Sequence, residues 1–124
     1  MKALVIIDMQ NDFLHPDGAY ARGNQTADSM VPLPERLLAV AQAIRKAGGW
    51  IVSTHFTIIT GKNGAPFISP HLKALRPFLQ KGDFQSGGWG HDVLDILRPV
   101  DIKVEKVAYS AFYQSRLEFA LKKA

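Results

Sequence analysis

The stretch Val5–Phe13, VIIDMQNDF, joins the most hydrophobic run of the chain to a cluster of polar side chains. Five apolar residues, from Ala3 to Ile7, lead directly into Asp8. A strand buried on both faces reads as a nearly continuous apolar run, and ligands of open parallel sheets lie just beyond the carboxyl ends of such strands. The run therefore predicts a central strand over Ala3–Asp8, with Asp8 at the ligand-binding edge.

The next segments predict a helix followed by a second strand. Pro34 suits a first helical turn, and Gly48-Gly49 ends the helical pattern. The apolar positions between them recur at helical spacing: Leu37, Val40, Ala41, Ile44 and Ala47. Trp50–His55 then reads as a strand. Strand, helix and strand in this order form a right-handed parallel unit.

The second half of the chain predicts two short helices, a third strand and a last helix. Ser69 as a cap with Pro70 in the first turn begins one short helix, and residues 91–97, closed by Pro99, form the other. Residues 102–106 alternate between apolar and charged side chains, so we expect a half-exposed strand in which Val104 and Lys106 share a face. Residues 115–123 place apolar side chains on one helical stripe.

These elements predict an α/β fold, a three-layer Rossmann-like parallel sheet that is incomplete. If strands two and three are added on one side of the first strand, their right-handed crossovers lie on one face of the sheet. The other face and the free edge of the first strand then remain uncovered. The last helix resembles a crossover that leads to a fourth strand, which this chain does not supply.

Composition indicates one soluble domain, because 124 residues with 47% apolar content are enough for a packed core. The 15 basic and 11 acidic residues leave a net charge of +4, but no sustained basic run, so we expect no nucleic-acid partner. No window approaches the roughly 18 apolar residues of a membrane span, and a signal peptide is absent. We therefore expect a cytoplasmic protein without a membrane partner.

Asp8 and Lys106 are the candidate catalytic residues, although each has a simpler interpretation. Asp8 could cap a loop or pair with a surface lysine, and Lys106 could be a long side chain that extends from a strand end to solvent. Considered together, two strand ends at one edge of a parallel sheet can bring an acid and a lysine into one cleft. Each would then tune the pKa of the other.

The motifs VIIDMQNDF and VEKVAYSAFY, with GGWIVSTHF between them, resemble the isochorismatase-like cysteine hydrolase superfamily. This superfamily includes nicotinamidases, N-carbamoylsarcosine amidohydrolases and ureidoacrylate amidohydrolases. The resemblance implies Asp8 as general base and Lys106 as the second catalytic residue. It also implies hydrolysis of a C–N amide or carbamoyl bond of a small molecule, or of an enol ether.

The resemblance covers residues 1–124, which correspond to about the N-terminal two-thirds of a family domain. In the family the nucleophile is a cysteine on the segment after the fourth strand, whereas this chain has no cysteine at all. No residue can be assigned to that role, so we expect the chain alone to be inactive. We therefore expect a homo-oligomer or a complementing C-terminal segment. The alternative is a non-catalytic member that binds a small ligand or assembles through its exposed sheet.

The remaining candidates concern metal binding and the walls of a substrate pocket. The four histidines show no ligand-pair spacing, and STHFTIIT lacks the Asp-x-His of metal-binding relatives, so we interpret the histidines as loop or surface residues. They are His15, His55, His71 and His91. We expect no metal and no other cofactor. Phe13, Trp89 and Phe112 could wall a small apolar substrate pocket, although aromatic residues more often belong to a core.

Overall fold

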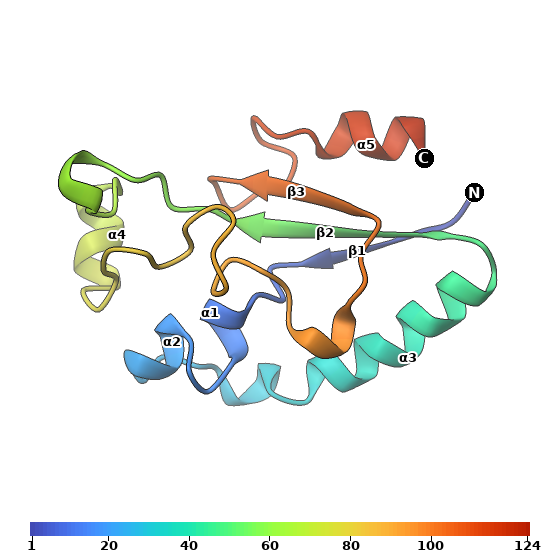
Figure 1. Ribbon diagram of the computed structural model, residues 1–124, viewed down its shortest axis with the longest axis horizontal. Helices are drawn as coiled ribbons and strands as arrows, with labels where there is room; N and C mark the ends of the chain where they lie inside the picture. The colour runs from blue at the N-terminus through green and yellow to red at the C-terminus, as the bar shows by residue number, and fades with distance from the viewer.

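Three parallel strands form the centre of the computed structural model, which describes residues 1–124 (Figure 1). The central strand is β2 (Trp50–Phe56), with β1 (Ala3–Ile7) and β3 (Ile102–Lys106) on its two sides. The helices are α1 (Asn11–Leu14), α2 (Ala19–Arg22), α3 (Leu33–Lys46), α4 (Pro70–Leu75) and α5 (Leu117–Lys123), and the 3₁₀ helices are η1 (Asp28–Met30), η2 (Lys62–Gly64) and η3 (Asp95–Leu97). The predicted α/β class is confirmed.

Helix α3 covers one face of the sheet. Its buried Ala41 packs against Ile6 of β1 and Ile51 of β2, in a cluster that Met9 and Leu97 complete. Of the predicted apolar stripe, Leu37, Ala41 and Ile44 pack in this cluster, whereas Val40 and Ala47 are exposed. The helix ends where Gly48 adopts a φ of 76°, a left-handed conformation that glycine tolerates without strain. With 14 residues α3 is the longest helix, and none of the helices has the length and apolar character of a membrane span.

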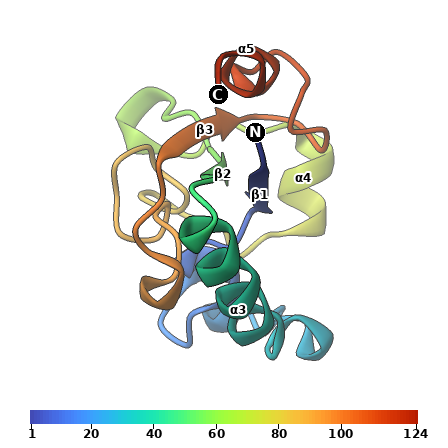
Figure 2. The same ribbon diagram turned by 90° about the vertical axis from the view of Figure 1, so that its right-hand side faces the viewer.

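Helix α5 covers the opposite face, which the sequence predicted to be bare. Its Leu117 and Ala120 pack against Val52 of β2 and Val104 of β3. Figure 2 shows α3 and α5 on opposite sides of the sheet. That part of the prediction is wrong because the chain crosses to the second face after β3 and folds its last helix back over the strands.

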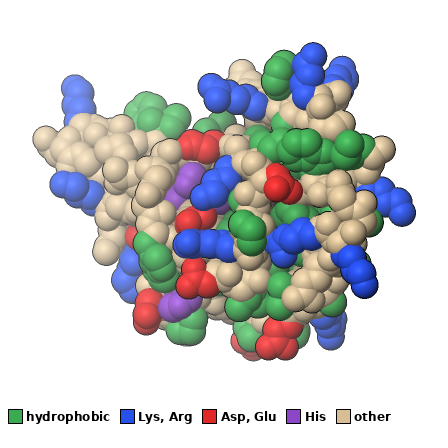
Figure 3. All heavy atoms as spheres, turned by 45° about the vertical axis from the view of Figure 1, so that its right-hand side comes forward, with side chains coloured by type: hydrophobic (Ala, Val, Ile, Leu, Met, Phe, Trp, Pro, Cys, Tyr) green, Lys and Arg blue, Asp and Glu red, His purple; other side chains and the backbone are tan.

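Strand β1 lies at an edge of this sheet and not at its centre. Its apolar run was predicted to be buried on both faces, but only Ile6 is buried, and Ile7 remains 53% exposed. Among residues 1–124, no strand pairs with its outer side. The surface in Figure 3 exposes apolar atoms below α5, while basic and acidic side chains alternate over the middle of the view.

Most predicted elements are present, but the helix expected over residues 91–97 is wrong. Only the short η3 is helical there, and Val93 forms an antiparallel bridge with Gln10. The Leu94 N–H donates to the Met9 carbonyl at 2.9 Å, and the Asn11 N–H donates to the Asp92 carbonyl at 2.9 Å. The segment is extended because its backbone bonds to the residues that follow β1, a long-range pairing that local periodicity does not report.

The polar residues after β1 hold these loops together. The buried Gln10 side chain accepts from the Phe56 N–H at 2.8 Å and donates to the Phe56 carbonyl at 2.9 Å. The buried Asp12 carboxylate accepts from the Ala19 N–H at 3.0 Å and the Phe84 N–H at 2.7 Å. Gly90 passes so close that an added Cβ would lie 2.0 Å from Asp12 Oδ2. These side chains therefore fix the loops around the carboxyl ends of the strands.

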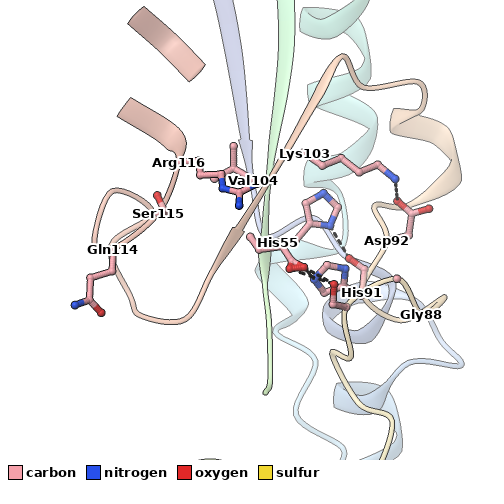
Figure 4. A pocket seen from close by; sticks show the side chains of 12 residues that line it. His55, Gly88, His91, Asp92, Lys103, Val104, Gln114, Ser115 and Arg116 are labelled. Atoms are coloured by element: carbon pink, nitrogen blue, oxygen red, sulfur yellow. Dashed lines mark hydrogen bonds and ion pairs between the residues drawn. The ribbon is translucent and has the colours of Figure 1, made fainter. Parts of the chain in front are cut away.

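The interpretation of the histidines as loop or surface residues is wrong for His55, which is buried within β2, whereas His91 lies in a loop but is also buried. His55 in β2 is 1% exposed, and His91 is 8% exposed. His55 lies 2.7 Å from the His91 carbonyl through Nδ1 and 2.7 Å from the Ser53 hydroxyl through Nε2. The two imidazole rings lie 5.0 Å apart (Figure 4). These hydrogen bonds explain the burial of His55, because each of its ring nitrogens has a partner.

Burial lowers the pKa of His55 and of His91 below the ordinary value of 6.5. For His55, the hydrogen bond to the His91 carbonyl opposes this shift without reversing it. For His91, the nearby imidazole of His55 adds to the effect of burial. Both rings are therefore neutral in the folded protein at neutral pH.

We predict that the free energy of unfolding falls as the pH decreases below about 6.5. The unfolded chain binds protons on these histidines at their ordinary pKa, whereas the folded chain resists protonation. The unfolded state therefore binds more protons than the folded state. The free energy of unfolding falls by up to about 1.4 kcal/mol per pH unit for each histidine. Denaturant unfolding measured at several pH values between about 7.5 and 5 tests this.

The control compares buried with exposed histidine. His55→Gln should reduce the slope of stability against pH, whereas His71→Gln, at an exposed position of α4, should leave it unchanged. A wild-type slope that persists in the double variant His55→Gln/His91→Gln would contradict the prediction.

Candidate active site

Asp8 immediately follows β1 and lies at the carboxyl edge of the sheet. Its φ of 56° is in the left-handed region, which few non-glycine residues adopt. The Asp8 N–H donates to the Thr54 carbonyl of β2 at 3.2 Å, and the Thr54 hydroxyl donates to Asp8 Oδ1 at 3.1 Å. Strand β2 therefore fixes both the backbone and the carboxylate of Asp8.

Lys106, the last residue of β3, reaches the same carboxylate. Its Nζ lies 2.9 Å from Asp8 Oδ2 and donates to the Tyr109 carbonyl at 2.8 Å. The Lys106 side chain is 5% exposed and the Asp8 side chain 23%. The prediction that these two residues lie within ion-pair reach is confirmed, because this distance is well inside the limit of about 4 Å. The pair crosses the end of β2, which separates β1 from β3.

A cavity of about 450 Å³ opens beside the ion pair. Most of its wall is apolar and includes Phe13, Tyr20, Phe56, Ile58, Phe67 and Leu72. Its polar residues are Asp8, Thr57, Ser69, His71, Arg76 and Lys106. Cavities of this volume, apolar with a few placed polar groups, are typical of small-molecule sites. The geometry presents a carboxylate and an ammonium to a small molecule with an apolar part.

Only one of the three aromatic residues predicted as pocket walls lines this cavity. Phe13 does so, and its ring contacts that of Tyr20 at a centroid distance of 4.8 Å. Trp89 lies elsewhere, packed edge-on against His15, and Phe112 is 59% exposed in the loop after β3. The other aromatic wall residues come from α2, from β2 and from loops, as with Tyr20, Phe56 and Phe67, so no single local pattern predicts that they line one cavity.

The hydroxyl groups of the cavity are engaged in structural hydrogen bonds. The Thr57 hydroxyl donates to the His55 carbonyl at 3.0 Å, and Ser69 Oγ accepts the Leu72 N–H at 3.1 Å as the cap of α4. Two further serines, Ser110 and Ser115, do not line the cavity. The Thr57 hydroxyl also lies 2.8 Å from His91 Nε2, but its proton is donated to the His55 carbonyl, so this imidazole does not activate it as a nucleophile. The chain has no cysteine. The cavity therefore presents the paired carboxylate and ammonium of Asp8 and Lys106 beside hydroxyl groups that are already hydrogen-bonded.

A second cavity, of about 540 Å³, lies at the outer side of β3 and contains neither Asp8 nor Lys106. It is polar, and charged side chains of both signs line it, among them Asp92, Lys103 and Arg116 (Figure 4). Lys103 Nζ lies 3.1 Å from Asp92 Oδ1, so part of this charge is paired within the protein. No group of three or more His, Cys, Asp or Glu side chains is placed to hold a metal ion.

Comparison with curated proteins shows similarity to amidohydrolases. The chain is 28% identical over 133 residues to the ureidoacrylate amidohydrolase RutB of Caulobacter vibrioides, covering 97% of this chain and 58% of that protein. It is 30% identical over 133 residues to the ureidoacrylate amidohydrolase RutB of Cronobacter sakazakii, covering 97% and 56%. The chain therefore spans a little over half the length of these relatives.

Comparison with solved structures shows the same fold. The N-carbamoylsarcosine amidase of Thermoplasma acidophilum matches with a TM-score of 0.70 and 26% identity, over 99% of this chain and 62% of that one. An isochorismatase family protein of Desulfovibrio vulgaris subsp. vulgaris str. Hildenborough matches with a TM-score of 0.73 and 21% identity, over 98% and 60%. At this lower identity the likeness establishes the fold alone.

The family assignment rests on the whole chain. The family model of the isochorismatase domain matches residues 2–124, which include both strand ends of the candidate site. The α/β sheet and the structural neighbours agree with this match. The chain belongs to the isochorismatase family of hydrolases.

Proposed function

We propose that this chain provides the acid–lysine part of a site that hydrolyses a C–N amide or carbamoyl bond of a small molecule. The observation that carries the proposal is the ion pair of Asp8 and Lys106, 2.9 Å apart and facing an apolar cavity. Relatives named ureidoacrylate amidohydrolase and N-carbamoylsarcosine amidase support amide chemistry.

In this proposal Asp8 is the general base and Lys106 the second catalytic residue. Asp8 takes the proton of a thiol nucleophile and passes it to the leaving nitrogen, which avoids expulsion of an unprotonated amide anion. Lys106 holds the carboxylate in place and stabilises negative charge on the thiolate or the substrate. The thiol comes from outside residues 1–124, because these contain no cysteine.

The burial of the pair supports a functional role over a purely structural one. Taking two charges out of water is costly, and replacing a buried ion pair by apolar residues of similar volume is often neutral or stabilising. A pair with a 5% exposed lysine is therefore weak as a device for stability alone. Because the pair lies beside a cavity, its charged groups can act on a bound small molecule.

The absence of cysteine favours a second candidate function, in which the protein binds a small ligand or assembles through its exposed sheet without catalysis. The intact mass of the protein isolated from its natural source separates the two candidates. A mass well above 13.7 kDa favours the hydrolase, because additional chain could carry the nucleophile. A mass that equals this value favours the binding function.

We predict that the purified 124-residue chain does not hydrolyse amides or carbamoyl compounds. Release of ammonia or amine from a nicotinamide, ureidoacrylate or carbamoyl substrate should match the uncatalysed rate. Turnover that survives purification and disappears in Asp8→Ala would contradict this prediction. That result would indicate direct attack by water with Asp8 as base.

We also predict that the two residues of the ion pair are strongly coupled in stability. Lys106→Met should destabilise the fold by about 3 to 5 kcal/mol, because it leaves the carboxylate of Asp8 without its counter-charge. The double variant Asp8→Asn/Lys106→Met should recover most of that loss. Denaturant unfolding of the wild type, the two single variants and the double variant gives the coupling energy. Additive effects of the two substitutions would contradict a buried pair.

The exposed β1 leads us to propose that the protein is a homo-oligomer or takes up a complementing segment. An unpaired apolar edge strand is a template for further strand pairing. Light scattering after size exclusion, at low micromolar concentration, should therefore give a mass above the 13.7 kDa of one chain. Val5→Lys, on the half-buried side of β1, should shift the mass toward the monomer. A compact wild-type monomer that binds no hydrophobic dye would contradict the proposal.

A further inference from the structure

The charges of the active-site cavity do not balance. Its lysine, arginine and acidic side chains are Asp8, Lys106 and Arg76. Asp8 and Lys106 neutralise each other at 2.9 Å. No carboxylate lies within ion-pair distance of Arg76, whereas Arg22 and Arg98 both have acidic partners. The cavity therefore carries one positive charge without a counter-ion in the protein.

Arg76 is also held in place. It follows α4 and is half-buried. Its Nε donates to the Tyr20 hydroxyl at 3.3 Å, its Nη1 donates to the Leu75 carbonyl at 3.2 Å, and its guanidinium lies 5.5 Å from the centre of the Tyr20 ring. Because a guanidinium has five N–H donors, these two bonds leave donors free.

The Tyr20 ring beneath the Arg76 guanidinium is held in place by neighbouring aromatic rings. The Tyr20 ring packs edge-on against Phe78 at 5.2 Å and Phe84 at 5.9 Å, and it contacts Phe13 at 4.8 Å. Phe84 is completely buried. A guanidinium that rests on a fixed aromatic ring loses less side-chain entropy when it binds a ligand, so its free donors are preorganised.

We propose that Arg76 is a specificity-determining residue that binds a carboxylate of the substrate. The substrate would thus be a small amide or carbamoyl compound with an apolar part and one carboxylate, and not a neutral amide. The planar fork of the guanidinium matches the two oxygens of a carboxylate. A single unpaired cation suits one negative charge, and the mainly apolar wall reduces competition from water. The assignment rests on the proposed function, since it takes this cavity as the substrate pocket.

Equilibrium binding to the 124-residue chain tests the proposal with two matched probes, N-carbamoylglycine and N-carbamoylglycinamide. Both probes have the carbamoyl group, but N-carbamoylglycine ends in a carboxylate and N-carbamoylglycinamide ends in a neutral amide. NMR titration yields each Kd, and the Nε–H resonance of Arg76 reports contact directly. We expect the carboxylate to bind about tenfold tighter than the amide, the ratio that corresponds to one charge-assisted hydrogen-bonding group.

Three variants separate recognition by Arg76 from general charge effects. Arg76→Gln should weaken binding of the carboxylate about tenfold and leave the amide unchanged. Arg36→Gln removes the same charge from an exposed position of α3 and should change neither Kd. Arg76→Lys keeps the charge without the fork and should bind the carboxylate with intermediate affinity. If Arg76→Gln does not fold, the comparison of Arg76→Lys with the wild type decides.

Three results would overturn the proposal. The first is equal affinity of the wild type for the two probes. The second is carboxylate binding that survives in Arg76→Gln, or that is unchanged in Arg76→Lys. The third is equal weakening of carboxylate binding by Arg76→Gln and by Arg36→Gln. Survival in Arg76→Gln would indicate that the carboxylate binds elsewhere, for example at Lys106. Failure of the proposed hydrolytic function is recognised separately, by an absence of turnover in the protein isolated from its natural source. That result would leave the binding preference of the 124-residue chain unchanged.

Discussion

A lysine ammonium cannot be buried in this fold without a nearby negative charge, and that constraint organises the carboxyl edge of the sheet. Lys106 ends β3, Asp8 follows β1, and their side chains meet across the end of β2 at 2.9 Å. The constraint also shapes the loop after β3, because the Tyr109 carbonyl accepts a second hydrogen bond from the ammonium. The Lys106 ammonium thus joins the end of β3 to the distant end of β1 and to the loop that follows β3.

The polar residues after β1 extend this arrangement to the walls of the cavity. Gln10 ties the end of β2 to the loop that contains His91, and Asp12 ties that region to α2 and to Phe84. The apolar strand therefore ends in side chains that replace the hydrogen bonds a loop would otherwise make to water. These bonds explain why a strongly apolar run is followed at once by amides and carboxylates: the first carboxylate serves the cavity, and the following polar groups hold the loops that enclose it.

Sequence reasoning recovered the features that depend on local periodicity or on strand order. The alternation over Ile102–Lys106 gave β3 with its observed bounds and placed Lys106 on the face of Val104. Parallel strand order then brought Lys106 to Asp8. The extended conformation around Val93 and the burial of His55 depend on partners distant in the sequence, so no local pattern reports them. Most of the cavity wall was missed for the same reason. Phe13 belongs to α1 and Trp89 to a loop, and only the packing of these segments decides that Phe13 lines the cavity and Trp89 does not.

Under the proposed function, the ion pair takes part in the chemistry and the unpaired Arg76 takes part in recognition of the ligand. A cation already paired with a carboxylate binds a second carboxylate weakly, because the first competes for the same donors. Lys106, bonded to Asp8 and to the Tyr109 carbonyl, is therefore poorly suited to select an anionic ligand, whereas its position fixes the carboxylate of Asp8. Arg76 has the opposite character: its bonds to Tyr20 and Leu75 are to neutral groups, so its charge remains free for a ligand. Separating the two cations in this way allows an anionic compound to enter the cavity without displacing Asp8 from Lys106. That separation is needed if one site is to bind a carboxylate and also retain a carboxylate as its base.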